Sequence, residues 1–213
     1  MYAAVLFFVL MCWTATTRAD HHQSCRPTNL TGVMSVVSLR NQVKALAPYT
    51  YDATNKKLRF RSNSSNQWNA TLEVDLLVFF EEGILYKIDS KNQSCEKKAL
   101  QATYHPFALP SNAVYQATLV FGSASIEGEG LKANIWFIPT PDVKGQSIMS
   151  LSMGCIPISL MHVAEDTMLI FSNMDVEQEI KDPDLLAVPS FCQGLAVEET
   201  PEGTVYGFMT EFM

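Results

Sequence analysis

Apolar and polar residues alternate along several short stretches of the chain, as they do in β-strands that bury one face. In residues 72–80 the apolar side chains recur at every second position, with Glu73 and Asp75 between them. The alternation resumes over residues 84–88, after the turn residues Glu82-Gly83. Two alternating runs separated by a turn predict a β-hairpin.

The same period predicts a second hairpin and further strands. Residues 113–121 and 131–137 alternate on either side of a Glu-Gly-Glu-Gly loop. A long helical pattern is missing from the sequence, although Asp182-Pro183 is typical of the start of one short helical turn. We therefore expect an all-β fold of the sandwich or barrel kind. Further short runs, separated by Pro, Gly, Asn and Asp, cover residues 33–39, 49–51, 57–61, 147–153, 156–163 and 168–172.

Parts of both hairpins are apolar on both faces. Leu77 and Phe79 lie on the otherwise polar side of the first hairpin, and Trp136 and Ile138 lie on that of the second. Both sides must then be covered. One interpretation is a sheet packed against another sheet or against a second copy of the chain. The other is a curved sheet around an apolar ligand cavity; the pattern alone favours the first.

The first residues form an apolar run that is too short to cross a membrane, for which about 20 apolar residues are needed. This run covers residues 3–13 and is followed by Thr17-Arg18-Ala19, which has small residues where a signal peptidase cuts. We expect residues 1–19 to be a signal peptide and residues 20–213 to form a single secreted domain. The alternative is a buried N-terminal helix.

Charge and motif content exclude several classes of function. The 213 residues include 22 acidic and 15 basic ones, a formal net charge of −7, which is not the footprint of a nucleic-acid-binding protein. No apolar run has the length of a membrane span. The sequence contains no P-loop, Gly-x-Ser-x-Gly elbow or His-Glu-x-x-His motif, and we interpret His105 and His162 as structural. We predict that the protein is not an enzyme.

The cysteines fit an oxidising compartment. Apart from Cys12 in the expected signal peptide, the chain has Cys25, Cys95, Cys155 and Cys192. Four is an even number, and none of these cysteines has the close neighbour that zinc sites require. We expect two long-range disulfides, for which the sequence leaves three pairings open.

Four Asn-x-Ser/Thr triplets indicate a glycoprotein. They begin at Asn29, Asn63, Asn69 and Asn92, and each lies in a polar stretch between apolar runs. Such stretches accommodate a bulky glycan. We expect Asn69 and Asn92, which flank the first hairpin, to be the strongest acceptors.

Acidic clusters are candidates for calcium binding, because calcium prefers oxygen ligands and needs no fixed spacing outside the EF-hand, whose loop is missing here. The candidates at expected loops or strand ends are Glu81, Glu82, Asp182, Asp184, Glu198 and Glu199. The ordinary alternative for each cluster is a solvated acidic surface.

A second metal candidate depends on the signal cleavage. If Ala19 is the last residue removed, the chain begins Asp20-His21-His22. The free amine, two backbone amides and the His22 imidazole then offer four nitrogens in one plane, an arrangement that Cu(II) prefers. The alternative is a solvated chain end.

Several segments together resemble a known family. Phe80-Glu81-Glu82-Gly83, Ile88-Asp89-Ser90-Lys91-Asn92 and Ser94-Cys95 are similar to the signature segment of the fish ependymins, and agreement continues to Trp136 and Cys192. The resemblance implies a secreted, calcium-binding glycoprotein homodimer of extracellular (brain) fluid, involved in cell-matrix adhesion through partners such as collagen. It also implies two antiparallel sheets forming a curved sandwich around a hydrophobic pocket, as in bacterial lipoprotein carriers.

The resemblance also bears on individual residues. It favours Asn69 and Asn92 as glycosylation sites, and disulfides that join Cys25 to Cys155 and Cys95 to Cys192. Two functional hypotheses remain: a calcium-responsive adhesion glycoprotein, and a soluble carrier that holds a lipid-like hydrophobic ligand in its pocket.

Overall fold

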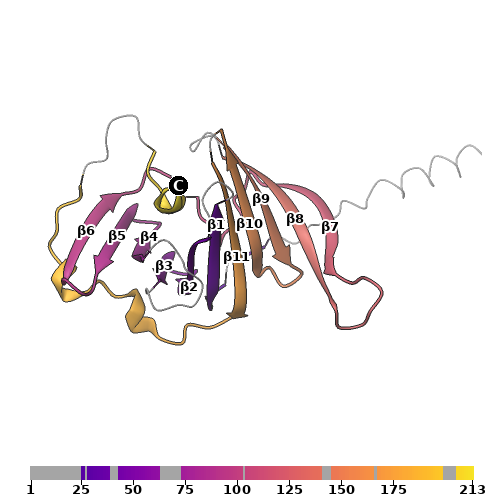
Figure 1. Cartoon of the computed structure of the whole chain (residues 1–213), viewed down its shortest axis with the longest axis horizontal. Helices are drawn as coiled ribbons and strands as arrows, with labels where there is room; N and C mark the ends of the chain where they lie inside the picture. The colour runs from indigo at the N-terminus through magenta and orange to yellow at the C-terminus, as the bar shows by residue number, and fades with distance from the viewer. Residues whose placement is uncertain are drawn as a thin grey trace, which may run out of the picture.

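Eleven antiparallel strands form one open sheet in the computed structural model (Figure 1). The structure describes residues 25–26, 28–38, 43–62, 73–102, 104–140, 145–165, 167–198 and 205–213. The strands are β1 (Leu30–Ser38), β2 (Val43–Asp52), β3 (Lys57–Arg61), β4 (Asp75–Phe79), β5 (Ile84–Asp89), β6 (Ser94–Ala99), β7 (Val114–Gly122), β8 (Gly130–Thr140), β9 (Gly145–Ser152), β10 (Pro157–Ala164) and β11 (Met168–Glu177).

The strand order explains the shape of the sheet. It runs β6-β5-β4-β3-β2-β1-β11-β10-β9-β8-β7, so two meanders meet where β1 pairs with β11. The strands β6 and β7 follow each other in the sequence but lie at opposite edges of the sheet. The segment between them, residues 100–113, must therefore cross the molecule, and we call it the crossing segment.

The predicted all-β class, both hairpins and the six further strand runs are confirmed. The two expected sheets are two halves of one hydrogen-bonded sheet, which bends so that the halves stand on either side of the C-terminal segment (Figure 1). The predicted helical turn is the 3-10 helix η2 (Pro183–Leu186), with Asp182 as its N-cap. Two more 3-10 helices, η3 (Ser190–Cys192) and η4 (Phe208–Phe212), and the polar edge strand β6 were not predicted.

The concave face of the sheet carries the main core. One row of paired residues crosses six strands from β8 to β2 without a polar side chain. It consists of Trp136, Met149, Leu160, Phe171, Val36 and Ala45, and all six are buried. Side chains of alternating strands that point to one face in register form such a row. An unbroken apolar row on the concave face thus joins both halves of the sheet.

At the end of the sheet formed by β4 and β5, a short segment around η3, residues 188–195, covers the convex face. We call this segment the strap. Leu77 and Phe79 of β4, which are apolar on the expected polar side, form a second buried cluster with Tyr86 and Ile88 of β5. Val188 and Leu195, on either side of η3, pack on this cluster. The second apolar face of the first hairpin is therefore covered by the strap.

Two disulfides join distant segments of the chain. Both pairings implied by the family resemblance are confirmed. Cys95 on β6 joins Cys192 of η3, with 5.5 Å between their Cα atoms, and so fastens the strap to the sheet edge. Cys25 joins Cys155 in the β9–β10 turn, 130 residues later, with a Cα–Cα distance of 5.3 Å. In the chain-entropy model, loops of this length give each bond a stabilisation of about 4–5 kcal/mol.

Candidate functional site

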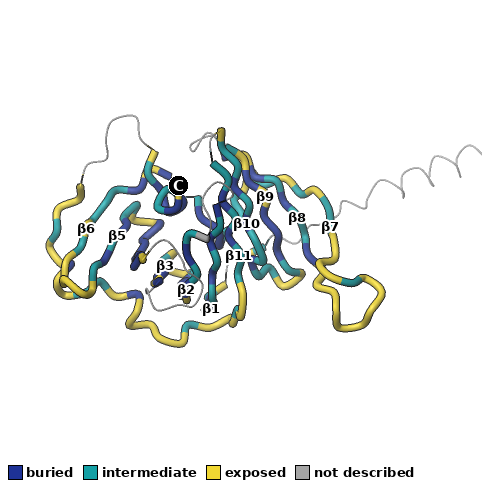
Figure 2. Tube along the Cα trace, viewed as in Figure 1, coloured by how far each residue is buried: buried dark blue, intermediate teal, exposed yellow. Residues whose placement is uncertain are grey.

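Two segments of the chain itself lie over the concave face. One is the crossing segment, and the other is the C-terminal segment, residues 205–213, which contains η4. Figure 2 shows that η4, beside the C-terminus, is buried between the two halves of the sheet. The two segments touch where Ala102 and Gly207 form a backbone bridge. The candidate site is the concave face beneath them.

The aromatic side chains of η4 bridge the two halves of the sheet. Phe212 lies 5.7 Å, ring centroid to ring centroid, from both Phe60 of β3 and Phe171 of β11. Phe208 contacts the same two rings at 6.4 and 6.2 Å, and Phe80 at 6.4 Å. Edge-to-face contacts at such distances are favourable beyond the area they bury. The space between the halves is therefore filled by the chain.

The crossing segment places a histidine in this core. His105 stacks on Phe80 with 3.9 Å between ring centroids, and its Nδ1 accepts a hydrogen bond from the Phe107 backbone N–H at 3.3 Å. Phe107 in turn stacks on Tyr51 of β2 at 4.9 Å. Burial, together with the charge of Lys56, lowers the pKa of His105 to about 3. The imidazole is thus a neutral part of the core.

Positive charges lie at the β5–β6 edge of the concave face. Lys87 is in register with Leu76 and Phe60, and its Nζ lies 3.5 Å from Oε2 of Glu211 in η4. Lys98 points to the same face, and its Nζ lies 5.5 Å from the ring centroid of Tyr206. Burial lowers the pKa of Lys98, but the hydrogen bond and charge of Glu96 and the charges of Glu211 and Glu198 outweigh this and raise it.

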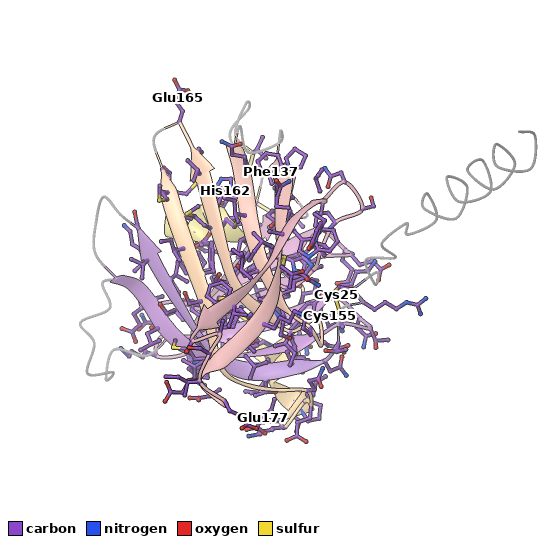
Figure 3. All side chains as sticks on the ribbon, turned by 90° about the vertical axis from the view of Figure 1, so that its right-hand side faces the viewer. Cys25, Phe137, Cys155, His162, Glu165 and Glu177 are labelled. Atoms are coloured by element: carbon purple, nitrogen blue, oxygen red, sulfur yellow. A yellow bond between two sulfur atoms is a disulfide. The ribbon has the colours of Figure 1, made fainter. Side chains whose placement is uncertain are left out.

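A buried polar pair lies toward the opposite edge. Ser147 of β9 and His162 of β10 are fully buried, and Ser147 Oγ lies 3.0 Å from His162 Nδ1. Burial lowers the pKa of His162. Figure 3 shows His162 within β10, while Glu165 points outward at the tip of the hairpin. Among the described side chains, His162 Nε2 and the hydroxyl of Tyr49 are buried without a hydrogen-bond partner.

A hollow of about 570 Å³ is lined by charged side chains of both signs. Its lining includes the acidic side chains of Glu73, Asp75, Asp89 and Glu96 and the basic ones of Arg61, Lys87 and Lys91. Asp75 forms a buried ion pair with Arg59, whose Nη2 donates to Asp75 Oδ2 at 2.8 Å. Lys91 is paired with Glu73 at 2.9 Å. Arg61 also pairs with Asp75 at 3.6 Å, so four of these charges form ion pairs within the hollow, whereas Lys87 pairs with Glu211 outside its lining.

The acidic residues predicted for calcium lie on three separate segments. Glu81, next to Glu82 in the β4–β5 turn, pairs with Lys56 at 3.3 Å. Asp182 Oδ1 accepts a hydrogen bond from the Asp184 backbone N–H at 3.1 Å. The backbone N–H of Glu198 donates to the backbone carbonyl of Lys97. Within the described ranges, no three acidic, histidine or cysteine side chains are arranged to hold a metal ion. Glu199 lies outside these ranges, and the calcium site stays a prediction.

The expected glycosylation sites differ in accessibility. Asn92 is exposed in the β5–β6 turn, where its Nδ2 donates to Asp89 Oδ2 at 2.7 Å. Asn29 is half-buried, and its Oδ1 accepts from the Ala53 backbone N–H at 3.0 Å. Asn63, Asn69, the predicted signal peptide and His22 lie outside the described residues. Asn92 is therefore the accessible acceptor among those described.

A bent open sheet that buries its concave face under its own chain, with two disulfides, defines a disulfide-bonded β-protein of oxidising, extracellular surroundings. No helix in the described part of the chain has the length and apolar character to cross a membrane. The chain belongs to the ependymin family, whose model, Ependymin, matches residues 68–192. It is an ependymin-type extracellular protein.

Individual relatives agree with this assignment. The chain is 40% identical to Ependymin-1 of Oncorhynchus mykiss, over 99% of this chain and 97% of the relative. It is 39% identical to Ependymin of Esox lucius, over 93% and 94%. An uncharacterised conserved protein of Thermus thermophilus has a similar structure, with a TM-score of 0.51 at 7% identity, over 84% of this chain and 97% of that one. This last likeness shows the fold alone.

The neutral state of His105 predicts a pH dependence of stability. Below about pH 6.5 the unfolded chain binds a proton at this residue that the folded chain does not, because the folded pKa is about 3. The neutral His105 therefore contributes stability at neutral pH, and this contribution is lost as the pH falls from about 6.5 toward 3. Between pH 7 and 4.5 we expect His105→Phe to lose about 2–3 kcal/mol less than the wild type, as measured by urea unfolding.

Phe79→Leu is the control, because it removes a buried ring from the convex cluster and leaves the surroundings of His105 unchanged. It should lower stability by the same amount at both pH values. An equal pH dependence in wild type and His105→Phe would contradict the account of His105.

Proposed function

We propose that this protein is an extracellular carrier of lipid-like apolar ligands, which bind on the concave face of the sheet. One observation carries the proposal: an unbroken apolar row crosses six strands, and what covers it in the described structure is not a second sheet. The cover consists of the crossing segment and η4. Concave apolar surfaces with a few polar groups are typical of small-molecule sites.

The buried polar groups support the same proposal. Tyr49 and His162 each place a polar atom inside the protein with no hydrogen-bond partner among the described residues. A buried polar atom without a partner costs about 1–3 kcal/mol, and in native proteins water or a ligand commonly supplies the missing partner. A face that is mainly apolar but contains such atoms is suited to an amphipathic molecule rather than to a pure hydrocarbon.

The carrier function predicts that native protein contains lipid. Protein purified from a secreting cell without detergent should yield extractable single-chain lipid, and its native mass spectrum should contain adducts. After delipidation it should bind a fluorescent fatty acid, which unlabelled fatty acid displaces. The same fluorophore without the alkyl chain is the matched control and should not bind. A purely apo mass spectrum together with no fatty-acid uptake would contradict the proposal.

We also propose a homodimer formed through the edge strand β7. Large apolar side chains are exposed on the β7–β8 hairpin: Val114 by 52%, Leu119 by 55%, Phe121 by 42% and Leu131 by 47%. The hairpin stands at one side of the molecule, away from η4 (Figures 1 and 2). An apolar edge strand is a natural template for pairing with another chain. This arrangement supports the dimer implied by the family resemblance.

The dimer proposal predicts that Leu119→Lys yields monomers in light scattering at concentrations where the wild type is dimeric, because a charge at a sheet edge opposes pairing. Leu185→Lys, at an exposed position in η2, is the control and should stay dimeric. A wild-type monomer, or a Leu119→Lys dimer, would argue against this interface.

Calcium binding and adhesion to matrix partners such as collagen remain a second proposal. Membership of the ependymin family, the net charge of −7 and the exposed acceptor Asn92 support it. We expect binding to immobilised collagen to be stronger in millimolar calcium than in chelator. Equal binding in both would sink the calcium part of this proposal.

A further inference from the structure

We propose that the concave face is a binding site for an anionic single-chain amphiphile, a molecule of the fatty-acid class, and that residues 206–213 fill this site as a competing internal occupant. The inference rests on the carrier function proposed above and adds to it a head-group site and a mechanism of entry. It comes from the chemistry of residues 206–213 of the C-terminal segment, which we call the plug.

The plug has an apolar body of the kind that a lipid tail would replace. Phe208 and Phe212 have no exposed surface, and Met209 is 2% exposed. Their partners, Phe60 and Phe171, belong to opposite halves of the sheet. Removing the plug would thus uncover one continuous apolar surface between the halves.

The plug also has an anionic head. The side chain of Glu211 is only 6% exposed, although it is a carboxylate, and its charge lies 3.5 Å from Lys87 Nζ. The hydroxyl of Tyr206 donates a hydrogen bond to Glu211, and the positive charge of Lys98 interacts with the same carboxylate. Lys87 itself is 43% exposed, so this cationic corner lies at the rim of the site. A fatty acid would place its tail between the sheet halves and its carboxylate at the rim.

The plug is attached in a way that permits its release. In the described chain, the backbone ties between the plug and other segments lie at its start: the N–H groups of Gln101 and Ala102 donate to the Tyr206 carbonyl, Gln101 Oε1 accepts from the Tyr206 N–H, and Gly207 forms a bridge with Ala102. The N–H groups of Gly207, Thr210 and Met213 all donate within the plug. The plug can therefore leave without breaking any pairing among the eleven strands, and the packing of Phe208, Met209 and Phe212 is the main interaction that a ligand would have to replace.

Competition has a measurable consequence. A ligand that binds only the open form has an apparent Kd equal to its intrinsic Kd divided by the open fraction. A change that weakens the plug therefore tightens ligand binding, the opposite of what loss of a ligand-contacting residue would do.

The test compares plug variants with a matched core variant, using a fluorescent fatty acid as the probe. Phe212→Ala should lower the apparent Kd at least about tenfold, because loss of a buried ring weakens the closed form strongly. Glu211→Gln, which keeps the shape of the plug, should lower the Kd in the same direction. Phe79→Ala removes a ring that is only 6% exposed from the convex cluster and should leave the Kd unchanged.

The head-group site is tested with the methyl ester of the same probe. Wild-type protein should bind the acid at least about tenfold more tightly than the ester, since an ion pair at a partly buried site favours the charged head. Lys87→Gln should remove this preference. Lys91→Gln, which removes the same charge outside the concave face, should retain it.

The possible outcomes separate the plug from the carrier function. Fatty-acid binding with the same Kd in wild type, Phe212→Ala and Glu211→Gln would overturn the plug and leave the carrier proposal standing. An equal gain in Phe79→Ala would also overturn it, because general loosening would then explain the effect. No binding to any folded variant, including Phe212→Ala, would overturn both the carrier function and the plug. An unchanged preference in Lys87→Gln would overturn the head-group site.

Discussion

The whole structure depends on the need to cover one apolar face of an open sheet. Eleven strands in a single layer have no partner sheet to bury their concave side, which carries an apolar row from β8 to β2. The chain meets this need in two ways. The sheet bends until its halves approach each other, and the crossing segment and η4 occupy the space between them. The disulfide from β6 to η3 fastens the strap that covers the convex side.

The strands could be predicted because alternation is a local signal. In the run 84–88, for example, Tyr86 and Ile88 alternate into the convex cluster, and this period is visible in a short window. The edge strand β6 had no such signal, since Glu96, Lys97 and Lys98 offer no apolar alternation. The pattern also could not distinguish two sheets from one bent sheet, because strand order is decided by contacts between distant segments.

The candidate site was harder to predict than the fold, for a related reason. The apolar strands suggested a cavity, but nothing local marked Phe208 and Phe212 as the side chains that fill it. The ion pair between Lys87 and Glu211 joins residues that are far apart in the sequence. The acidic clusters were visible in the sequence, yet those within the described ranges lie on separate segments and have local partners. The disulfide pairing came from family resemblance, as spacing left three possibilities open.

The central claim is that a ligand and the C-terminal segment compete for one apolar surface. The most direct measurement is fluorine NMR of folded, delipidated protein that carries 4-fluorophenylalanine at position 212. We predict that adding fatty acid moves this resonance from a buried to a solvent-exposed position, in proportion to the bound fraction. A resonance that keeps its buried position while the protein is saturated with fatty acid would contradict the account.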